Sequence, residues 1–508
     1  MKMFEQKKLS FDDGGEYGDI HDYIIKYFSH NDFCSVDERL KGEEKYATRL
    51  EILEGVDRRA VSFQMSKNDN MHGWLKYREG FSASLVNLMI DRMNLSAGSC
   101  ILDPFFGSGT TGLAAGYRGI NSVGFDILPI SKISIAAKKE ASGVDIPQLE
   151  KLIDEIERLK IPDDFMGKIN SVRITDGAYP DGVERKLAYI SFWIDKMELG
   201  KGLRQLMLLG IVNSLETVSY TRKDGQYLRW DCRSRKTYRS NKRKHQEESI
   251  GKKNILNKGD LPDIYLTISS ELRRMRDDII CMKKNNIEIV GDITYYEESV
   301  LKKLPTFDDD YFDGVITSPP YCNRYDYTRT YALELAYMGL DSMGIKNLRQ
   351  TLLSCTVENK SKVEWLRQYY SEIGKMNRFH DVMDILESSK IYVETMSALR
   401  ARAMDGYLNN RAVVNMVSNY FVELCFVYYE IHRTNKNGSK IFFVNDNVRY
   451  AGEVIPVDTI SSDFAERIGF VADKIYCIKQ RKGNSSQQMK SFGRVALRKS
   501  ITEWTVEK

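Results

Sequence analysis

The spacing of apolar and polar residues predicts alternating strands and helices along most of the chain. Residues 81–93 place Leu85, Leu88 and Met89 at helical spacing, and the short apolar run at 100–103 is typical of a buried strand. A glycine-rich turn, a helical stretch and a second apolar run at 121–127 follow, which completes a strand–helix–strand unit. The chain is therefore predicted to have an α/β fold with a mostly parallel sheet.

Apolar runs of the same kind return after a long interval. We expect strands at 287–293, at the start of 311–321, at 440–446 and at 473–480, and a long helix over 408–432. The residues between the two groups are helical in places and strongly basic at their centre, which indicates an insertion. The predicted division is an N-terminal extension at 1–70, a first half of the α/β domain at 71–145, an inserted region at 146–285, and a second half at 286–508 with a helical insertion near 341–405.

Composition adds few constraints. The chain has 508 residues, 42% of them apolar, and a formal net charge of +4, so its overall charge does not identify a nucleic-acid partner. Its 8 cysteines include no Cys-x-x-Cys pair and no Cys/His cluster with zinc-ligand spacing, so we expect no metal site and a reducing, cytoplasmic compartment. Neither a signal peptide nor a membrane-spanning apolar run is evident, so no membrane association is expected.

The turn DPFFGSGTT at 103–111 is the first candidate ligand site. Gly107 and Gly109 lie where a strand must turn into a helix, and glycine both tolerates such angles and lets a ligand approach the backbone. Asp103 can meet an ammonium group, and Asp126 ends the next strand, about 20 residues on, where nucleotide-binding units hold ribose hydroxyls. The turn lacks the Lys-Ser/Thr ending of a phosphate loop, which argues against a nucleoside triphosphate. A tight turn without a ligand is the alternative.

The second candidate is TSPPY at 317–321, directly after a predicted strand. Two consecutive prolines fix two φ angles and remove two N–H donors, so the carbonyls of Ser318 and Pro319 form a rigid pair of acceptors. Such a pair suits an exocyclic amino group, and Tyr321 offers a flat face on which an extruded base can stack. A rigid turn over a packed aromatic ring is the alternative. The motif's place at the carboxyl end of a parallel strand, the edge that binds ligands in such sheets, favours the functional interpretation.

Taken together, the two motifs resemble the cofactor-binding and catalytic motifs of the DNA amino-methyltransferases. Further stretches resemble one bacterial branch of that family, at 74–86, 219–230, 325–335 and 480–489. The resemblance implies a Rossmann-like class I methyltransferase fold, S-adenosyl-L-methionine as the methyl donor and double-stranded DNA as the substrate. It also implies a restriction-modification context, in which a cognate endonuclease would act on the same site.

Carried over by position, the resemblance gives each motif residue a role. The catalytic residues would be Ser318, Pro319, Pro320 and Tyr321. The cofactor-binding residues would be Phe81, Asp103, Phe105, Gly107, Gly109, Thr110, Asp126 and Asp292. Among these, Asp126 would bind the ribose hydroxyls, and Asp292, ending its own strand, would approach the adenine amino group.

The family divides over the base that is methylated. Serine at the first catalytic position is most often found in cytosine-N4 enzymes, so Ser318 favours cytosine N4 over adenine N6, although some adenine enzymes also carry serine. An RNA N-methyltransferase and a catalytically inactive DNA-binding protein are further alternatives. Cys322 lies one residue too late to be the nucleophile of a cytosine-C5 enzyme, and we expect it to be a buried apolar side chain.

A basic stretch with interleaved aromatic residues lies at the centre of the inserted region. We expect its cations to neutralise DNA phosphates and some arginines to contact guanine edges; a solvated charged loop is the alternative. The candidate DNA-binding residues are Arg222, Lys223, Arg229, Arg233, Arg235, Lys236 and Arg239.

Overall fold

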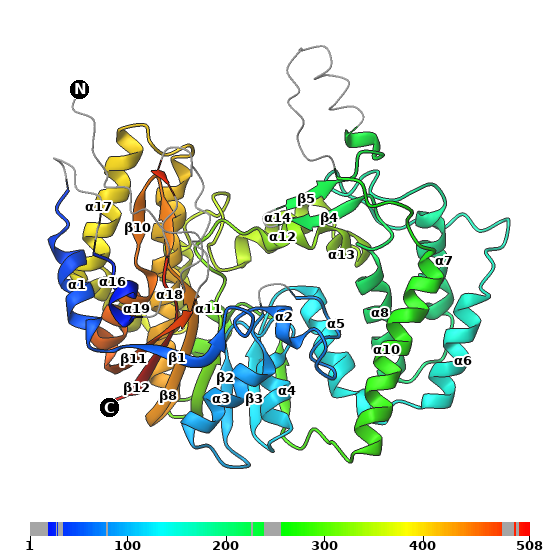
Figure 1. Ribbon diagram of the computed structural model, residues 1–508, viewed down its shortest axis with the longest axis horizontal. Coiled ribbons are helices and arrows are strands. Elements are labelled where there is room, and N and C mark those ends of the chain that lie inside the picture. The colour runs from blue at the N-terminus through cyan, green and yellow to red at the C-terminus, as the bar shows by residue number, and fades with distance from the viewer. Residues whose placement is uncertain are drawn as a thin grey trace, which may run out of the picture.

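A twisted eight-stranded sheet forms the centre of the molecule (Figure 1). The structure, a computed structural model, describes residues 19–26, 28, 34–77, 80–224, 227–237, 256–479, 492–493 and 497–508. In spatial order the strands are β1 (Leu50–Asp57), β11 (Phe470–Lys479), β12 (Lys499–Val506), β8 (Asn435–Asp446), β7 (Phe312–Thr317), β2 (Cys100–Asp103), β3 (Asn121–Phe125) and β6 (Ile293–Tyr296). β12 is antiparallel to both of its neighbours, and the other pairs are parallel. The predicted α/β class with a mostly parallel sheet is therefore confirmed.

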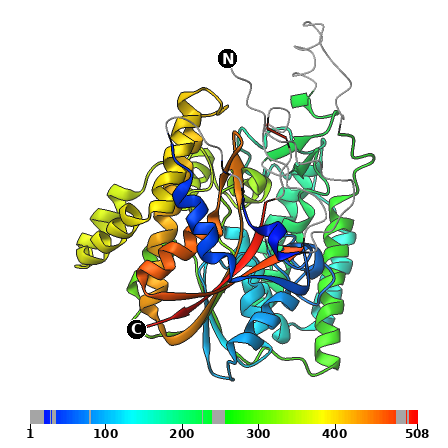
Figure 2. The same cartoon turned by 60° about the vertical axis from the view of Figure 1, so that its left-hand side comes forward.

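Helices cover both faces of this sheet because each strand buries apolar side chains on both sides. On one face α3 (Ala83–Met93) and α4 (Thr110–Gly116) pack against β2, β7 and β8. The other face is covered mainly by helices of the C-terminal half and by α1, which lie together at one end of the molecule in Figures 1 and 2. These helices are α1 (Asp37–Ala47), α15 (Val363–Glu372), α16 (Met376–Ser388), α17 (Lys390–Met404), α18 (Ala412–Thr434) and α19 (Val457–Ile468).

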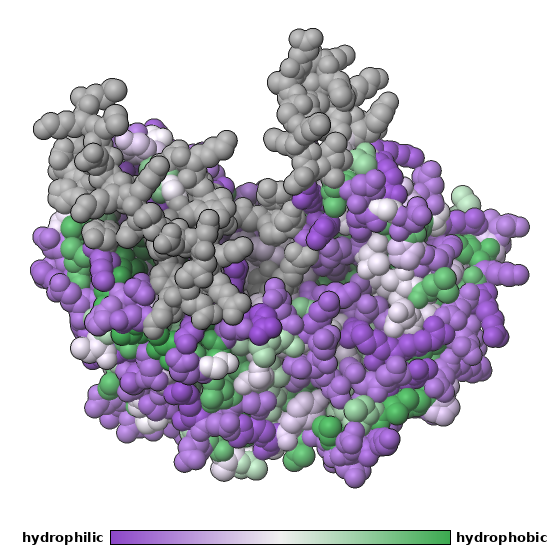
Figure 3. Space-filling view, in the orientation of Figure 1, coloured by the Kyte–Doolittle hydropathy of each residue, from purple (hydrophilic) through white to green (hydrophobic). Residues whose placement is uncertain are grey.

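The inserted region builds a second apolar core beside β3 and β6. This core is continuous with helices from both halves of the α/β domain, because α5 packs on α8 and α13 packs on α5. Its helices are α5 (Pro129–Lys139), α6 (Ile146–Glu157), α7 (Val183–Asp195), α8 (Lys201–Ser214), α10 (Ile264–Lys284), α12 (Tyr327–Thr330), α13 (Ala332–Tyr337) and α14 (Ser342–Thr351). The surface of this region in Figure 3 is mostly hydrophilic, with small apolar patches. A two-stranded hairpin, β4 (Thr221–Asp224) and β5 (Tyr227–Trp230), lies above α12 in Figure 1.

Several short elements connect these layers. They are η1 (Ile20–Tyr23), α2 (Phe63–Ser66), η2 (Ala141–Gly143), α11 (Val300–Lys303), η3 (Leu304–Thr306), β9 (Val448–Tyr450) and β10 (Glu453–Ile455). Within the described ranges, no helix is both long enough and apolar enough to cross a membrane.

The first 70 residues were expected to be an extension, but part of them belongs to the α/β domain. β1 pairs in parallel with β11 at the sheet edge, and Glu43 of α1 forms a buried ion pair with Arg498 at 2.8 Å. Arg498 also pairs with the buried Asp458 at 2.6 Å, so the N-terminal segment is fixed to the sheet by charges that have no access to water. An edge strand has only one neighbouring strand and needs few apolar residues, so the sequence of β1 gives little indication of a strand.

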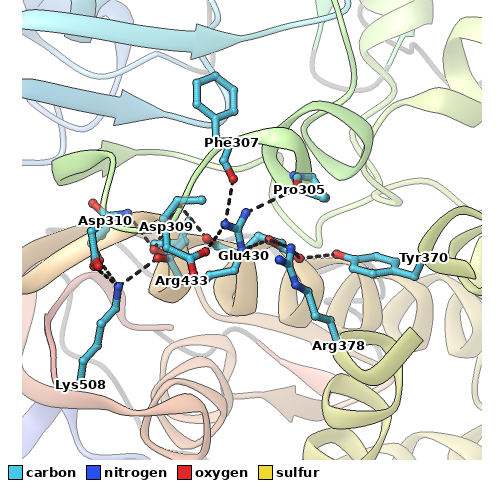
Figure 4. Close-up of polar contacts among 12 residues, drawn as sticks. Pro305, Phe307, Asp309, Asp310, Tyr370, Arg378, Glu430, Arg433 and Lys508 are labelled. Atoms are coloured by element: carbon cyan, nitrogen blue, oxygen red, sulfur yellow. Dashed lines mark hydrogen bonds and ion pairs between the residues drawn. The ribbon is translucent and has the colours of Figure 1, made fainter. Parts of the chain in front are cut away.

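A polar network ties α18 to the loop before β7 and to the chain's C-terminal residue (Figure 4). Arg433 donates to the carbonyl of Phe307 at 2.8 Å and pairs with Glu430 at 2.7 Å and with Asp309. Lys508 pairs with Asp310 of the same loop. The network lies at the amino ends of the parallel strands, opposite the ligand-binding edge.

Two strands differ from the expected pattern. Only Ile293 of the apolar run at 287–293 belongs to β6, and Val290 of that run is 73% exposed. The sheet also contains β12, which lies beyond the strand expected to be the last one. An antiparallel strand inserted between two others near the chain end gives no local indication of its position.

Candidate active site

The glycine turn has the backbone geometry that its sequence requires. Gly107 and Gly109 adopt φ of +50° and +79°. An added Cβ would lie 2.9 Å from the ring of Tyr77 at the first position and 2.9 Å from Ile135 at the second. The Asp126 carboxylate accepts a hydrogen bond from the Gly107 N–H at 2.9 Å, so the end of β3 holds the turn in place.

The two motifs meet at the same edge of the sheet. β2 and β7 are parallel neighbours, so Asp103 and Thr317, their last residues, lie side by side. The Thr317 hydroxyl donates to Asp103 Oδ1 at 2.6 Å across a sequence separation of 214 residues. Both side chains are buried, so this bond is shielded from water and links the glycine turn directly to the Ser-Pro-Pro-Tyr turn.

A single pocket is lined by residues of both motifs. The predicted residues that line it are Phe81, Asp103, Phe105, Gly107, Thr110, Asp126, Ser318 and Pro320. Gly109, Pro319 and Tyr321 are chain neighbours of lining residues but are not part of the wall.

Two carboxyl groups give the pocket its electrostatic character. Burial raises the pKa of Asp103 to about 6, although Thr111, Thr317 and the Phe105 N–H donate to it. Burial likewise raises the pKa of Asp126 to about 7, although the N–H groups of Leu128 and Gly107 donate to its carboxylate. Burial makes both groups costly to ionise, so a cationic or hydrogen-bond-donating ligand would favour their charged forms.

The prediction that Asp292 ends a strand at this edge is wrong. Asp292 precedes β6, lies at the opposite edge of the sheet and is 71% exposed, 3.6 Å from Lys139. The pocket instead receives Glu298, Ser299 and Val300, which follow β6. The sequence ITYY followed by EES is a signal that could have placed the strand correctly, because β-branched and aromatic residues favour strands and polar residues at a strand's carboxyl end are where ligands bind.

Lys138, which sequence reasoning missed, lies beneath the glycine turn. Its ammonium donates to the carbonyl of Ser108 at 2.7 Å, and the side chain is 2% exposed. Burial, together with repulsion from Arg274, lowers the pKa of Lys138 to about 7. A lysine on α5 gives no sequence indication of this role, because only the packing of the helix under the turn brings the two together.

Tyr321, the last residue of the Ser-Pro-Pro-Tyr turn, and Cys322, which follows it, differ in burial. Cys322 is fully buried, and burial raises the pKa of its thiol well above the ordinary range, so a thiolate nucleophile is disfavoured. Tyr321 is half-buried, and its hydroxyl accepts a hydrogen bond from Ser318 Oγ at 3.1 Å.

The basic stretch divides into exposed and structural cations. The expectation that Lys223 contacts DNA disagrees with its burial: it pairs with Glu334 and lies over the ring of Tyr331, 4.5 Å from the centroid. Lys236 donates to two backbone carbonyls at 2.7 and 3.0 Å and lies over Trp230, which fixes the hairpin to the segment before α7. Such contacts inside the protein explain why a run of cations does not by itself define a binding surface.

The remaining cations are distributed over the surface around the hairpin. Arg233 pairs with the buried Asp231 at 2.8 Å, and Arg235 is 78% exposed. Arg222 is exposed and stands directly opposite Arg229 in the β4–β5 register. Arg239 lies outside the described residues.

Known proteins match this chain over nearly its whole length. The N6_N4_Mtase family, described as DNA methylase, matches residues 2–135. The type II methyltransferase M.BsoBI of Geobacillus stearothermophilus is 47% identical over 483 residues, which cover 95% of this chain and 95% of that protein. The chain belongs to the DNA amino-methyltransferases of restriction-modification type.

Two further relatives are more distant. The type II methyltransferase M.AvaI of Nostoc sp. is 37% identical over 91% of this chain and 92% of its own length. M.MjaII of Methanocaldococcus jannaschii is 30% identical over 28% of each chain. No solved structure gives a significant match to the methyltransferase described here.

Enzymes of this family take their methyl group from S-adenosyl-L-methionine, and the pocket fits that donor. A molecule with an ammonium group, a sulfonium, ribose hydroxyls and an adenine ring needs anionic and apolar walls together. The pocket supplies the carboxyl groups of Asp103 and Asp126 and the rings of Phe81, Phe105 and Phe125. Burial raises the pKa of both carboxyl groups, and perturbed titratable groups of this kind cluster at functional sites.

Proposed function

We propose that this DNA methyltransferase modifies the exocyclic N4 amine of cytosine in double-stranded DNA. The observation that carries the proposal is the buried Thr317–Asp103 hydrogen bond of 2.6 Å, which fixes Ser318 at the rim of the pocket that suits the methyl donor. Serine at that position resembles the cytosine-N4 branch of the family. Adenine N6 is the alternative, because serine also occurs among enzymes that methylate adenine.

In the proposed reaction, the chain's own residues position the amine and exclude water. The target base leaves the duplex and stacks on Tyr321, while the carbonyls of Ser318 and Pro319 accept the two amino hydrogens. These hydrogen bonds draw the nitrogen lone pair out of conjugation with the ring and aim it into the pocket. The bound donor supplies an electrophilic methyl group, and orientation accounts for most of the rate increase.

Asp103 and Asp126 are proposed to hold the donor at its two polar ends. Asp103, at the end of β2, accepts a hydrogen bond from Thr317, the residue before the Ser-Pro-Pro-Tyr turn. It would therefore face the ammonium group of the methionine part. Asp126, at the end of β3, would accept hydrogen bonds from the ribose hydroxyls. Phe81 and Phe105 would cover the apolar surface between these ends.

The β4–β5 hairpin is proposed to contact the DNA backbone beside this pocket. β5 packs against α12, and Tyr327 of α12 lines the pocket, so the hairpin lies next to the catalytic rim. Arg222 and Arg229 stand opposite each other in the β4–β5 register, so the hairpin brings two arginines together beside the catalytic rim. Guanidinium groups suit the phosphate oxygens of a DNA backbone.

We also infer the cellular setting from the family. The enzyme would act in the cytoplasm on chromosomal DNA and would protect its site against an endonuclease that cleaves the same sequence. If so, plasmid DNA from expressing cells will resist one sequence-specific endonuclease in a panel while remaining sensitive to the others.

The deciding experiment is expression in a bacterial host that lacks its own DNA methylation, followed by mass spectrometry of DNA nucleosides and sequencing that detects modified bases. N4-methylcytosine at one short motif is the expected result. N6-methyladenine would replace the proposed base with the alternative. Unmodified DNA from cells that contain folded, donor-binding protein would refute catalysis.

A further inference from the structure

Tyr321, the aromatic residue of the catalytic turn, is held by a lysine from the far end of the chain. Lys499 is the first residue of β12, and its ammonium lies 4.8 Å from the centroid of the Tyr321 ring. The same nitrogen lies 3.5 Å from the Tyr321 hydroxyl, which also accepts a hydrogen bond from Ser318 at 3.1 Å. The hydroxyl end of the ring is thus held by one ammonium and by one hydroxyl donor.

Lys499 is itself fixed in position. It is 8% exposed and lies opposite Asp446, the last residue of β8, to which its ammonium is paired at 3.0 Å. Its chain neighbour Arg498 is buried among Glu43 and Asp458, which anchors the start of β12. A lysine that has so little freedom loses little conformational entropy in making a further contact.

The charge on Lys499 persists at working pH. Burial lowers the pKa of its ammonium, but attraction to Asp446 and contact with Tyr321 outweigh burial and leave the pKa raised. The ammonium lies at the hydroxyl end of the Tyr321 ring, so it limits the movement of that end of the side chain. The cation therefore helps to set the orientation in which the ring meets the substrate.

We propose that Lys499 is a positioning residue for methyl transfer, which holds the Tyr321 ring in the orientation that receives the flipped base. This inference rests on the proposed function, because it needs a base that leaves the duplex. Lys499 does not line the donor pocket, so its effect is confined to the DNA substrate and does not extend to the donor.

The test replaces Lys499 by methionine, which keeps the length of the side chain and removes the charge. We expect kcat/KM for DNA to fall roughly 3- to 30-fold, the range for loss of a desolvated cation–π contact, while the Kd of S-adenosyl-L-methionine measured by calorimetry stays unchanged. Lys499→Arg should recover most of the activity, because a guanidinium can stack on the same ring and pair with the same carboxylate. The matched control is Lys440→Met, which removes another ion-paired lysine from the same sheet, 2.9 Å from Asp473 and far from the catalytic turn.

A double-mutant cycle separates positioning from a general structural role. In a Tyr321→Ala background, Lys499→Met should cost nothing further, because the ring that it positions is absent. If Lys499→Met is as active as the control, or if it costs the same with and without the Tyr321 ring, the inference is overturned. Failure of the wild-type enzyme to methylate DNA would instead refute the proposed function, so the two failures are distinguishable. If Lys499→Met does not fold, the comparison of Lys499→Arg and Lys499→Gln in the same cycle decides the question.

Discussion

The hydrogen bond between Thr317 and Asp103 should control the pH dependence of cofactor binding. Thr317→Val keeps the shape of the side chain and removes the hydroxyl that donates to the carboxylate at 2.6 Å. A hydrogen bond to a charged group contributes about 1.5–3 kcal/mol, which corresponds to a rise of roughly one to two pH units in the pKa of the acceptor. Since the pKa of Asp103 is already raised to about 6, the variant would be largely protonated near neutral pH.

The consequence for binding follows if only the ionised Asp103 holds the ammonium group of the donor. At pH 7 the affinity for S-adenosyl-L-methionine should fall roughly 2- to 10-fold, and it should return almost to the wild-type value by pH 9, where the carboxyl group is ionised again. Isothermal titration calorimetry from pH 6 to 9 measures this profile. Recovery at alkaline pH distinguishes an electrostatic loss from a damaged pocket.

Thr502→Val provides the control for this change. Thr502 is a buried threonine of the same sheet, and its hydroxyl has no hydrogen-bond partner among the described residues. Its replacement should be neutral or slightly stabilising, and cofactor affinity should not change. The reasoning is refuted if Thr317→Val binds the donor normally at pH 7, or if its loss of affinity is the same at pH 9.

Three further outcomes are expected. Asp126→Asn should weaken donor binding about tenfold. In the wild type the affinity for the donor should fall as pH drops through about 7, the pKa to which burial raises this carboxyl group, and the variant should lack this fall; calorimetry checks both effects. Lys138 has a pKa of about 7 in the folded protein, which is below the pKa of a lysine in the unfolded chain. At pH values between these two pKa values the unfolded chain binds more protons, so the free energy of unfolding rises with pH. Urea denaturation from pH 7.5 to 9.5 should therefore show the wild type gaining on the order of 1 kcal/mol per pH unit relative to Lys138→Met. Arg222→Gln combined with Arg229→Gln should weaken DNA binding and reduce the slope of log affinity against log salt by up to about 2, and an unchanged slope would remove the hairpin from the interface.

The sequence was sufficient to place a residue wherever its position depends on its own strand end. Asp103, Asp126 and Ser318 each follow a short apolar run, and a parallel sheet brings such ends to one edge. The same logic failed for Asp292 because the run before it is a loop, in which Ile287 and Val290 are exposed. Apolar composition alone does not distinguish a strand from a loop.

Roles that depend on partners distant in sequence could not be predicted. Lys223 was expected to contact DNA because it lies in a basic run, but its partner Glu334 is 111 residues away and takes it into the core. Arg498 and Glu43 are separated by 455 residues, and their ion pair makes the N-terminal segment part of the α/β domain. A single sequence contains each half of such a pair but gives no indication that they meet.

The strand order explains how one pocket can depend on segments from the whole chain. β2 carries the donor motif, and β7, its neighbour, carries the catalytic turn, so their ends are joined by one buried hydrogen bond. β12 runs in the opposite direction, so its first residue, not its last, lies at that same edge, and Lys499 reaches Tyr321 from there. Because β12 is antiparallel, its first residue lies at the active-site edge. That residue directly follows the buried Arg498, whose ion pairs with Glu43 and Asp458 fix the start of the strand. If Lys499 positions Tyr321 as proposed, the N-terminal residues would contribute to catalysis through geometry alone, by holding β12 in place.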